Sequence, residues 1–303
     1  MKLKSNWLFY AVITTLFWGV WGALIEIPEK AGFPATLGYV VWALTMIPPA
    51  LLALNNIDWK LEYSGRDILY GCLAGFTGAG GQLILFQALR SGPAYLVFPI
   101  VSLSPLVTIL LCTFLLKETT SKIGWTGVIL AVIAIPLLSY QEPAGNPHAE
   151  GILWLFLALL VFGAWGFQAY VLRFANESMQ AESIFFYMMA TALALIPFAL
   201  WMTDFSQQIN WGFKGPYLAA LVHLLNSIGA LTLVFAFRYG KGIIVSPMVN
   251  AMAPVLTIII SLSIYAVIPH PVILSGMALA VVAAFLMGYE EEKEESTAES
   301  PSR

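Results

Sequence analysis

The sequence predicts an all-α integral membrane protein of ten transmembrane helices, arranged as two inverted five-helix repeats. Three observations lead to this fold class. The 303-residue chain is 59% hydrophobic and 10% charged, whereas soluble domains carry roughly a quarter charged residues. The apolar residues fall in blocks of about 20, the length of a helix that crosses a hydrocarbon core. The second half of the chain also repeats motifs of the first half.

The apolar blocks give the expected spans in order. Most blocks lack hydrophobic periodicity, as expected where both lipid and protein neighbours are apolar. The last two blocks are separated at Pro269-His270-Pro271, because proline is poorly tolerated inside a helix. The ten expected spans are 7–27, 34–54, 67–89, 93–116, 122–139, 151–173, 183–203, 214–237, 243–268 and 270–288.

The spans divide the chain into two similar parts joined by short segments. We expect a cytoplasmic N-terminus at 1–6, a first five-helix repeat at 7–139 and an outer linker at 140–150. A second five-helix repeat at 151–288 is followed by a cytoplasmic tail at 289–303. The tail is acidic and polar, a composition typical of disordered segments.

Lys and Arg are distributed unevenly over the expected loops. With the N-terminus inside, eleven of them fall on the inner side, and the outer side holds Lys30, Arg90 and Lys214. Cytoplasmic loops carry the excess of these residues, so both termini are expected in the cytoplasm. The compact loops favour a bacterial inner membrane.

The repeat is clearest around two pairs of prolines. Residues 88–109 align with 236–258 so that Pro99 and Pro105 match Pro247 and Pro254. Ser102 then corresponds to Asn250, and Trp21 corresponds to Trp165 in the first span of each half. Because each half has an odd number of spans, the second copy must be inverted in the membrane. Inverted repeats with interrupted helices are typical of secondary transporters, whose substrate binds between the halves.

The chain resembles the EamA-type transporters of the drug/metabolite transporter superfamily. The resemblance rests on the repeat and on the run from Ala88 to LLKETTSKIGWTGVILAV, where Glu118, Gly124 and Gly127 fit the family pattern. The second half has no counterpart of Glu118. The resemblance covers residues 7–288 and implies a central cavity, export or exchange of amino acids or related metabolites, and no prosthetic group.

Polar and aromatic residues inside the spans are the candidate substrate site, since such groups should face the bundle interior. His223 has two interpretations, a hydrogen bond to a neighbouring helix or proton handling. No cofactor or metal site is expected, because His148 and His270 lie in predicted loops. The candidate substrate-binding residues are Trp21, Gln82, Ser102, Trp165, His223, Asn226 and Asn250.

The four matched prolines are candidates for helix breaks or gating. Proline leaves backbone carbonyls without partners, and in a membrane these must face a cavity or another helix. The alternative is a pair of structural kinks relieved by nearby Ser and Thr. These residues are Pro99, Pro105, Pro247 and Pro254.

Small residues recur every four positions in the fifth and tenth spans, as Gly127-xxx-Ala131 and from Gly276 to Gly288. This spacing allows close helix packing. In the family that the chain resembles, these helices can form a homodimer contact. The alternative is packing within one chain.

We expect a secondary transporter that moves an amino acid-like, neutral or amphipathic metabolite by alternating access, as export or exchange. The sequence has no GxxxxGK[ST] motif for ATP, so the chain is not expected to be an enzyme that hydrolyses it. One alternative is an integral membrane enzyme of lipid-linked group transfer, which would need clustered acids or histidines. Another is a non-transporting scaffold or sensor. The expected partners are the small molecule and the lipid bilayer, with no nucleic acid.

Overall fold

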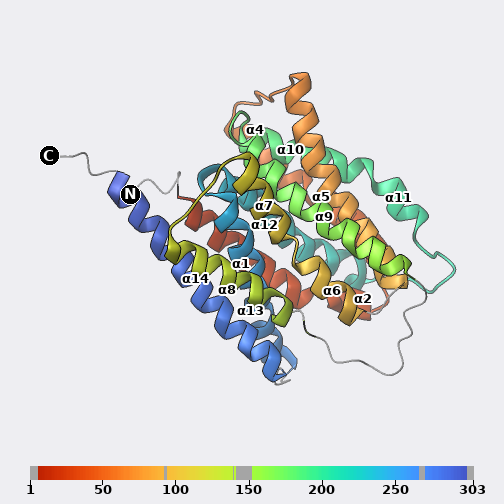
Figure 1. Cartoon of the computed structure of the whole chain (residues 1–303). Helices are drawn as coiled ribbons and strands as arrows, with labels where there is room; N and C mark the ends of the chain where they lie inside the picture. Colours follow the sequence, from red (N-terminus) through yellow and green to blue (C-terminus); the bar gives the residue numbers. More distant parts are fainter. Residues whose placement is uncertain (1–5, 92–93, 139, 141–151, 266–269, 299–303) are drawn as a thin grey trace.

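The computed structural model describes residues 6–91, 94–138, 140, 152–265 and 270–298, and within these ranges all regular structure is helical (Figure 1). Seven helices are long and apolar enough to cross a membrane. Three shorter apolar helices cover Ile100–Leu115, Lys122–Leu138 and Pro271–Met287. This agrees with the all-α class expected from composition.

Each predicted span coincides with helical structure, although half of them are built from two pieces. The single helices are α5 (Gly65–Ser91), α8 (Lys122–Leu138), α9 (Leu153–Ala175), α13 (Gly242–Tyr265) and α14 (Pro271–Ala298). The divided spans are α1 (Trp7–Leu24) with α2 (Glu26–Lys30), α3 (Ala35–Thr45) with α4 (Ile47–Asn56), α6 (Ala94–Ser102) with α7 (Pro105–Leu115), α10 (Ala181–Ala194) with α11 (Ile196–Trp201), and the short π-helix η2 (Phe213–Tyr217) with α12 (Leu218–Tyr239).

The second and seventh spans are broken at corresponding places. The first break lies at Met46, just before Ile47-Pro48, and the other at Leu195, just before Ile196-Pro197. Proline fits the first turn of a new helix, where its missing N–H would have had no partner. The same local sequence therefore divides the same span in both halves.

The helix-break prediction for the four prolines differs from the structure in the second half. The backbone between α6 and α7 is interrupted after Ser102, and Pro105 opens α7. Helix α13 instead runs on through Pro247 and Pro254. A separation of seven residues is close to two α-helical turns, so these two prolines lie on one face of α13. Pro99 and Pro105 do not share that spacing.

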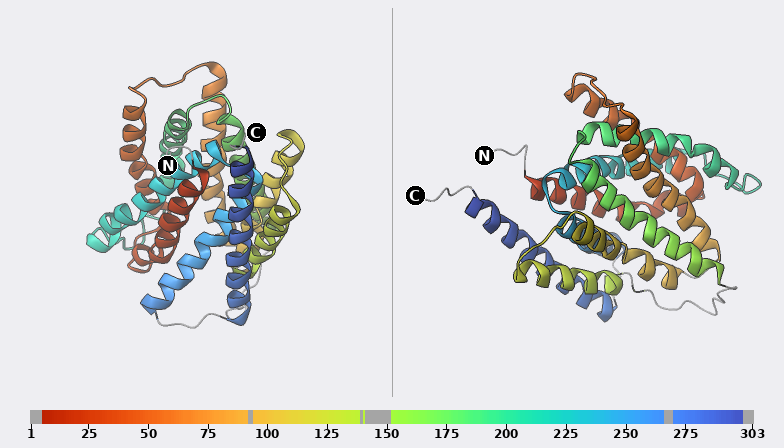
Figure 2. Two further views of the ribbon diagram at one scale, coloured as in Figure 1. Left: turned by 90° about the vertical axis from the view of Figure 1, so that its left-hand side faces the viewer. Right: turned by 45° about the horizontal axis from the view of Figure 1, so that its top comes forward.

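The helix contacts follow the repeat. Helix α1 packs against α12 and α13, while its counterpart α9 packs against α5 and α7. Helix α8 packs against α14, its own counterpart (Figures 1 and 2). If each helix is replaced by the corresponding helix of the other half, every one of these helix pairs becomes a pair that is also in contact.

The α8–α14 contact is formed by the small residues singled out in the sequence. A Cβ built on Gly127 would lie 3.0 Å from the Ala283 carbonyl oxygen, and one on Gly276 would lie 3.2 Å from that of Ala134. Small residues, glycine above all, allow such close approach of two helices. These positions pack within one chain, the alternative to a dimer contact. A homodimer through the outer faces of α8 and α14 stays a prediction.

Helix α14 extends beyond its apolar part, through residue 298. The segment expected to be disordered is therefore helical in backbone over most of its length. Its Glu and Lys residues have high helix propensity, which favours continuation of a helix already begun. The linker expected at 140–150 is described at Tyr140 alone.

The start of α1 and the end of α14 lie at the same end of the bundle, on the left of Figure 1. We call this the terminal end. Helix α2 lies at the other end (Figure 1), which we call the distal end. This arrangement fits an even number of crossings.

Candidate functional site

A cavity of about 600 Å³ lies inside the bundle. Most of its wall is formed by residues of α1, α3 and α5 from the first half and of α9, α12 and α13 from the second, and α2, α6, α8 and α10 add single residues. Sites for small molecules usually enclose roughly 300–1,000 Å³. The cavity therefore has the size of a metabolite site and lies where the two halves meet.

The structure brings most of the sequence-predicted substrate residues to this wall. The predicted residues that line the cavity are Trp21, Gln82, Trp165, Asn226, Asn250 and Pro254. Among the described side chains, Ser102 is half-buried outside the lining, and the nearby Ser104 lines the cavity instead. Pro105 and Pro247 are buried beside it, and the side chain of Pro99 lies outside the described part.

His223 lies behind the cavity wall, where it holds Trp21. The indole N–H of Trp21 donates to His223 Nδ1 at 3.3 Å. His223 is buried and does not itself line the cavity. A histidine that accepts at Nδ1 carries its proton on Nε2 when neutral. The first interpretation of His223, a hydrogen bond between helices, describes its observed contact.

The repeat mate of Trp21 is held in a similar way. Trp165 Nε1 donates to the carbonyl oxygen of Gly78 on α5 at 3.1 Å. A Cβ built on Gly81 would lie 2.5 Å from Trp165 Nε1, so the glycine is required for this indole position. On the other side, a Cβ on Gly229 would lie 2.4 Å from Trp18 Cδ1. Gly81 and Gly229 are separated by the same offset as Ala88 and Ala236.

The residues of the wall that sequence reasoning missed include Trp18, Trp42 and Gln168. Two of them could have been found, since Trp18 precedes Trp21 by three residues and Gln168 follows Trp165 by three. That spacing places side chains on one helical face. Trp42 gives no such signal, because no candidate site residue lies in its span.

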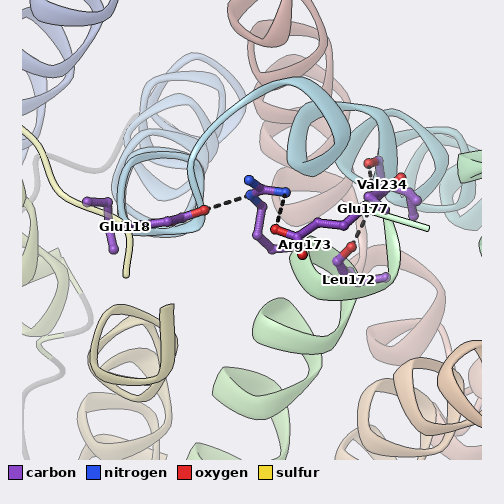
Figure 3. Close-up of polar contacts among 7 residues, drawn as sticks. Glu118, Leu172, Arg173, Glu177 and Val234 are labelled. Carbon is purple, nitrogen blue, oxygen red and sulfur yellow. Dashed lines mark hydrogen bonds and ion pairs between the residues drawn. The ribbon is translucent and has the colours of Figure 1, made fainter. Parts of the chain in front are cut away.

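A second polar cluster lies at the terminal end, where Glu118 joins three helices (Figure 3). Arg173 Nε, in the last turn of α9, donates to Glu118 Oε1 at 2.7 Å. The backbone N–H of Ile243, in the first turn of α13, donates to Glu118 Oε2 at 3.2 Å. Carboxylates are favoured at helix N-termini because the first N–H groups lack partners there. We call this cluster the Glu118 latch.

The local backbone orients the Glu118 side chain toward Arg173 and the Ile243 N–H. Lys117 has a left-handed φ of 56°, and the N–H of Glu118 donates to the Cys112 carbonyl oxygen at 3.1 Å. Together they turn the chain back beneath α7. A Cβ on Gly242 would lie 2.5 Å from Cys112 Sγ, so α7 and α13 meet closely here. Leu172, next to Arg173, lines the cavity, so the latch lies beside its terminal end.

The apolar helices and the internal cavity describe a multi-pass membrane protein. Residues 5–140 match the EamA-like transporter family. This match lies in the first half of the chain and agrees with the resemblance seen in the sequence.

The proteins to which the chain is similar include two curated proteins and one solved structure. It is 25% identical to Protein LicB of Haemophilus influenzae over 210 residues, 66% of this chain and 70% of that protein. It is 27% identical to an uncharacterized transporter in the cobO 3'region of Sinorhizobium sp over 143 residues, 45% of this chain and 99% of that protein. The crystal structure of one protein aligns with 91% of this chain and with 94% of its own chain. The TM-score is 0.73 and the sequence identity is 19%. That likeness shows the fold.

Proposed function

We propose that the protein is a secondary transporter that carries a small metabolite across the membrane by alternating access. The observation that carries this proposal is the cavity of about 600 Å³ between the two halves. A site bounded by both halves can be exposed to either side when one half moves against the other. The family match and the relative named as a transporter support the same function.

The exchange relation among the helix contacts supports an inverted repeat. The pairings of α1 with α12 and α13 correspond to those of α9 with α5 and α7. In an inverted repeat, each half can adopt the arrangement of the other, which produces a second state open to the opposite side. The two breaks before Ile47-Pro48 and Ile196-Pro197 are a further matched feature.

The Glu118 latch supports closure of the terminal end in this state. Its ion pair connects the end of α7 in the first half with α9 and α13 in the second. For the cavity to open toward the terminal end, these helices must separate and the ion pair must break. The distal end has Glu26 and Tyr140 in the cavity wall. We infer that this state exposes the cavity toward the distal end.

The substrate is expected to be an amino acid-like, neutral or amphipathic metabolite, moved by export or exchange. Gln82 and Gln168 line the cavity from α5 and α9, and neither side chain forms a hydrogen bond within the described residues. These amides can each donate to and accept from a substrate. The aromatic and aliphatic remainder of the wall suits an apolar body.

Counterflow in proteoliposomes tests the proposed function. Vesicles loaded with an unlabelled candidate metabolite should accumulate its labelled form without ATP, and empty vesicles should not. A membrane enzyme or a scaffold would give no accumulation with any member of a metabolite panel, even where the compound binds. That outcome would reject transport and favour one of these two alternatives.

Asn250 supplies the matched variant for this assay. It lines the cavity, and its Nδ2 donates to the Ser246 carbonyl oxygen at 2.9 Å. Asn250→Ala should weaken substrate binding by about 1–3 kcal/mol if a ligand polar group loses its partner, with a smaller effect on stability. Ser263→Ala, an exposed position on the same helix, should leave binding unchanged. Equal effects of both variants would remove Asn250 from the site.

A further inference from the structure

Four tryptophans line the cavity, and each has its indole N–H occupied by the protein. They come from both halves: Trp18 and Trp21 on α1, Trp42 on α3 and Trp165 on α9. The N–H groups donate to Asn226 O at 3.2 Å, His223 Nδ1 at 3.3 Å, Asn226 Oδ1 at 2.8 Å and Gly78 O at 3.1 Å, in that order. A ligand in the cavity therefore meets ring carbons and not N–H donors.

Indole rings presented in this way attract positive charge. The face of an aromatic ring carries a negative potential, and Trp binds cations more strongly than Tyr or Phe does. The hydrogen bonds also fix the rings before a ligand arrives, so little side-chain freedom is lost on binding. Several indoles around one cavity are the arrangement that recognises alkylated ammonium groups.

The charges around the cavity also favour a cationic ligand over an anionic one. Glu26 is the one charged side chain in its wall within the described part of the chain, and it forms an exposed ion pair with Lys30. Arg173 is paired in the Glu118 latch, outside the wall. An anionic ligand would be buried here without an opposite charge, which is costly. A cation meets no neighbouring positive charge, and the aromatic rings can offset part of the cost of taking it out of water.

We propose that the cavity binds an organic cation whose charge is carried by an alkylated ammonium group, a tertiary or quaternary amine. The proposal rests on the proposed function in taking this cavity as the substrate site. A primary ammonium would lose three strong hydrogen bonds to water and find no lining carboxylate apart from the exposed Glu26. Because alkyl groups spread the charge and replace those N–H donors, ring faces alone can stabilise the cation.

The free amides define the rest of the ligand. Gln82 and Gln168 offer donors and acceptors beside Trp165. A cation with a short neutral polar arm would place its ammonium against the indoles and its arm against these amides. Nothing in this assignment requires a negative group on the ligand.

Calorimetric binding to the purified full chain tests the proposal with a matched pair of probes. Benzyltrimethylammonium is the cation, and 2-methyl-1-phenyl-2-propanol is a neutral molecule of nearly the same shape. We expect the cation to bind roughly tenfold more tightly or better. Equal binding of the two probes would overturn the proposal, because the indoles would then serve only as an apolar wall.

Fluorinated tryptophan separates charge attraction from shape. Fluorine withdraws electron density from the ring and changes its volume little. Protein carrying fluorotryptophan should lose affinity for the cation stepwise with the number of fluorine atoms and keep its weak affinity for the alcohol. An unchanged ratio between the two probes would reject a cation site even where both bind.

Single substitutions place the effect in the cavity. Trp165→Leu should lower the affinity for the cation by roughly tenfold, and Trp165→Phe should lower it less. Trp201→Leu, at an 82% exposed position of α11, should have no effect. If Trp165→Leu fails to fold, the fluorination series on the intact fold decides the question.

Counterflow of benzyltrimethylammonium distinguishes this proposal from the proposed function. Tight, fluorine-sensitive binding without flux would leave the cation site standing and reject transport. Counterflow of a neutral metabolite, together with equal binding of the matched probes, would support transport and reject the cation site.

Discussion

Gly81 and its neighbour Gly80 lie side by side on α5 and meet different surroundings. A Cβ on Gly81 would lie 2.5 Å from Trp165 Nε1, whereas one on Gly80 would meet nothing within 4 Å. The first glycine is needed for the cavity wall, and the second is not. This pair allows the cost of displacing an indole to be measured against a matched change.

We predict that Gly80→Ala stabilises the protein by about 0.5–1 kcal/mol, because alanine loses less backbone entropy in a helix. Gly81→Ala should lower both stability and ligand binding, since Trp165 must move. Thermal unfolding in detergent and calorimetry measure the two effects. Equal shifts in the two variants would show that Trp165 does not depend on Gly81.

His223 provides a prediction on pH. Protonation would place a hydrogen on Nδ1, the atom that accepts from the Trp21 N–H, and so break this contact. Wild-type flux should therefore fall as the pH is lowered. His223→Gln keeps an amide carbonyl as acceptor and should give a flatter profile of flux against pH. If the two profiles coincide, protonation of His223 does not set the pH dependence of flux.

At the scale of elements, the Glu118 latch adds a polar contact where α7, α9 and α13 pack together. Glu118 is buried, and its charge is matched by Arg173 and the Ile243 N–H. Removing one partner of a buried ion pair leaves the other uncompensated. A native reporter lies beside it, since the fully buried thiol of Cys112 packs against Gly242.

We predict that Glu118→Gln loosens the terminal end and raises the rate at which Cys112 reacts with a maleimide. The measurement is made with Cys72 replaced by Ser. Glu177→Gln is the control, because Glu177 is 46% exposed and lies 3.7 Å from Arg173. Exposed ion pairs contribute about 0–1 kcal/mol, so this control should leave the rate unchanged. An unreactive Cys112 in both variants would show that Glu118 does not hold the helices together.

The sequence predicted the helices better than their contacts, for physical reasons that particular residues show. Apolar length fixes where α5 or α9 lies, because the hydrocarbon core sets the length of a helix. The same signal does not separate α3 from α4, since Ile47-Pro48-Pro49 changes the backbone but not the hydrophobicity. The sequence could not predict that Glu118 pairs with Arg173. The two residues are distant in sequence, and their pairing depends on how the two halves pack.

Trp42 shows the corresponding limit for the site. It reaches the cavity because α3 packs against α12, where its N–H meets Asn226. That approach depends on tertiary packing and leaves no mark in local spacing. The sequence repeat was enough to predict Trp21, Trp165 and Asn250, because they stand at matched positions of the two halves.

At the scale of the whole molecule, the shared position of the two chain ends leads to a topology prediction. With the terminal end in the cytoplasm, alternate crossings place the segment between α4 and α5 inside and the segment between α11 and η2 outside. Tyr63 in the first segment and Ser206 in the second are both exposed. In intact cells an impermeant thiol reagent should label Ser206→Cys and spare Tyr63→Cys. Opening the cells should make both reactive. Labelling of Tyr63→Cys alone in intact cells would reverse the orientation.

Helices α8 and α14 occupy corresponding positions in the two halves and contact each other, and this has a thermodynamic consequence. Gly127 meets Ala283 as Gly276 meets Ala134, so exchange of the two halves returns the same interface. If the two exposures of the cavity are related by that exchange, this interface contributes equal free energy to both. Strengthening it would raise the melting temperature and leave the balance between the two exposures unchanged. The Glu118 latch has no sequence counterpart in the second half, so it is a contact through which a single substitution can shift that balance.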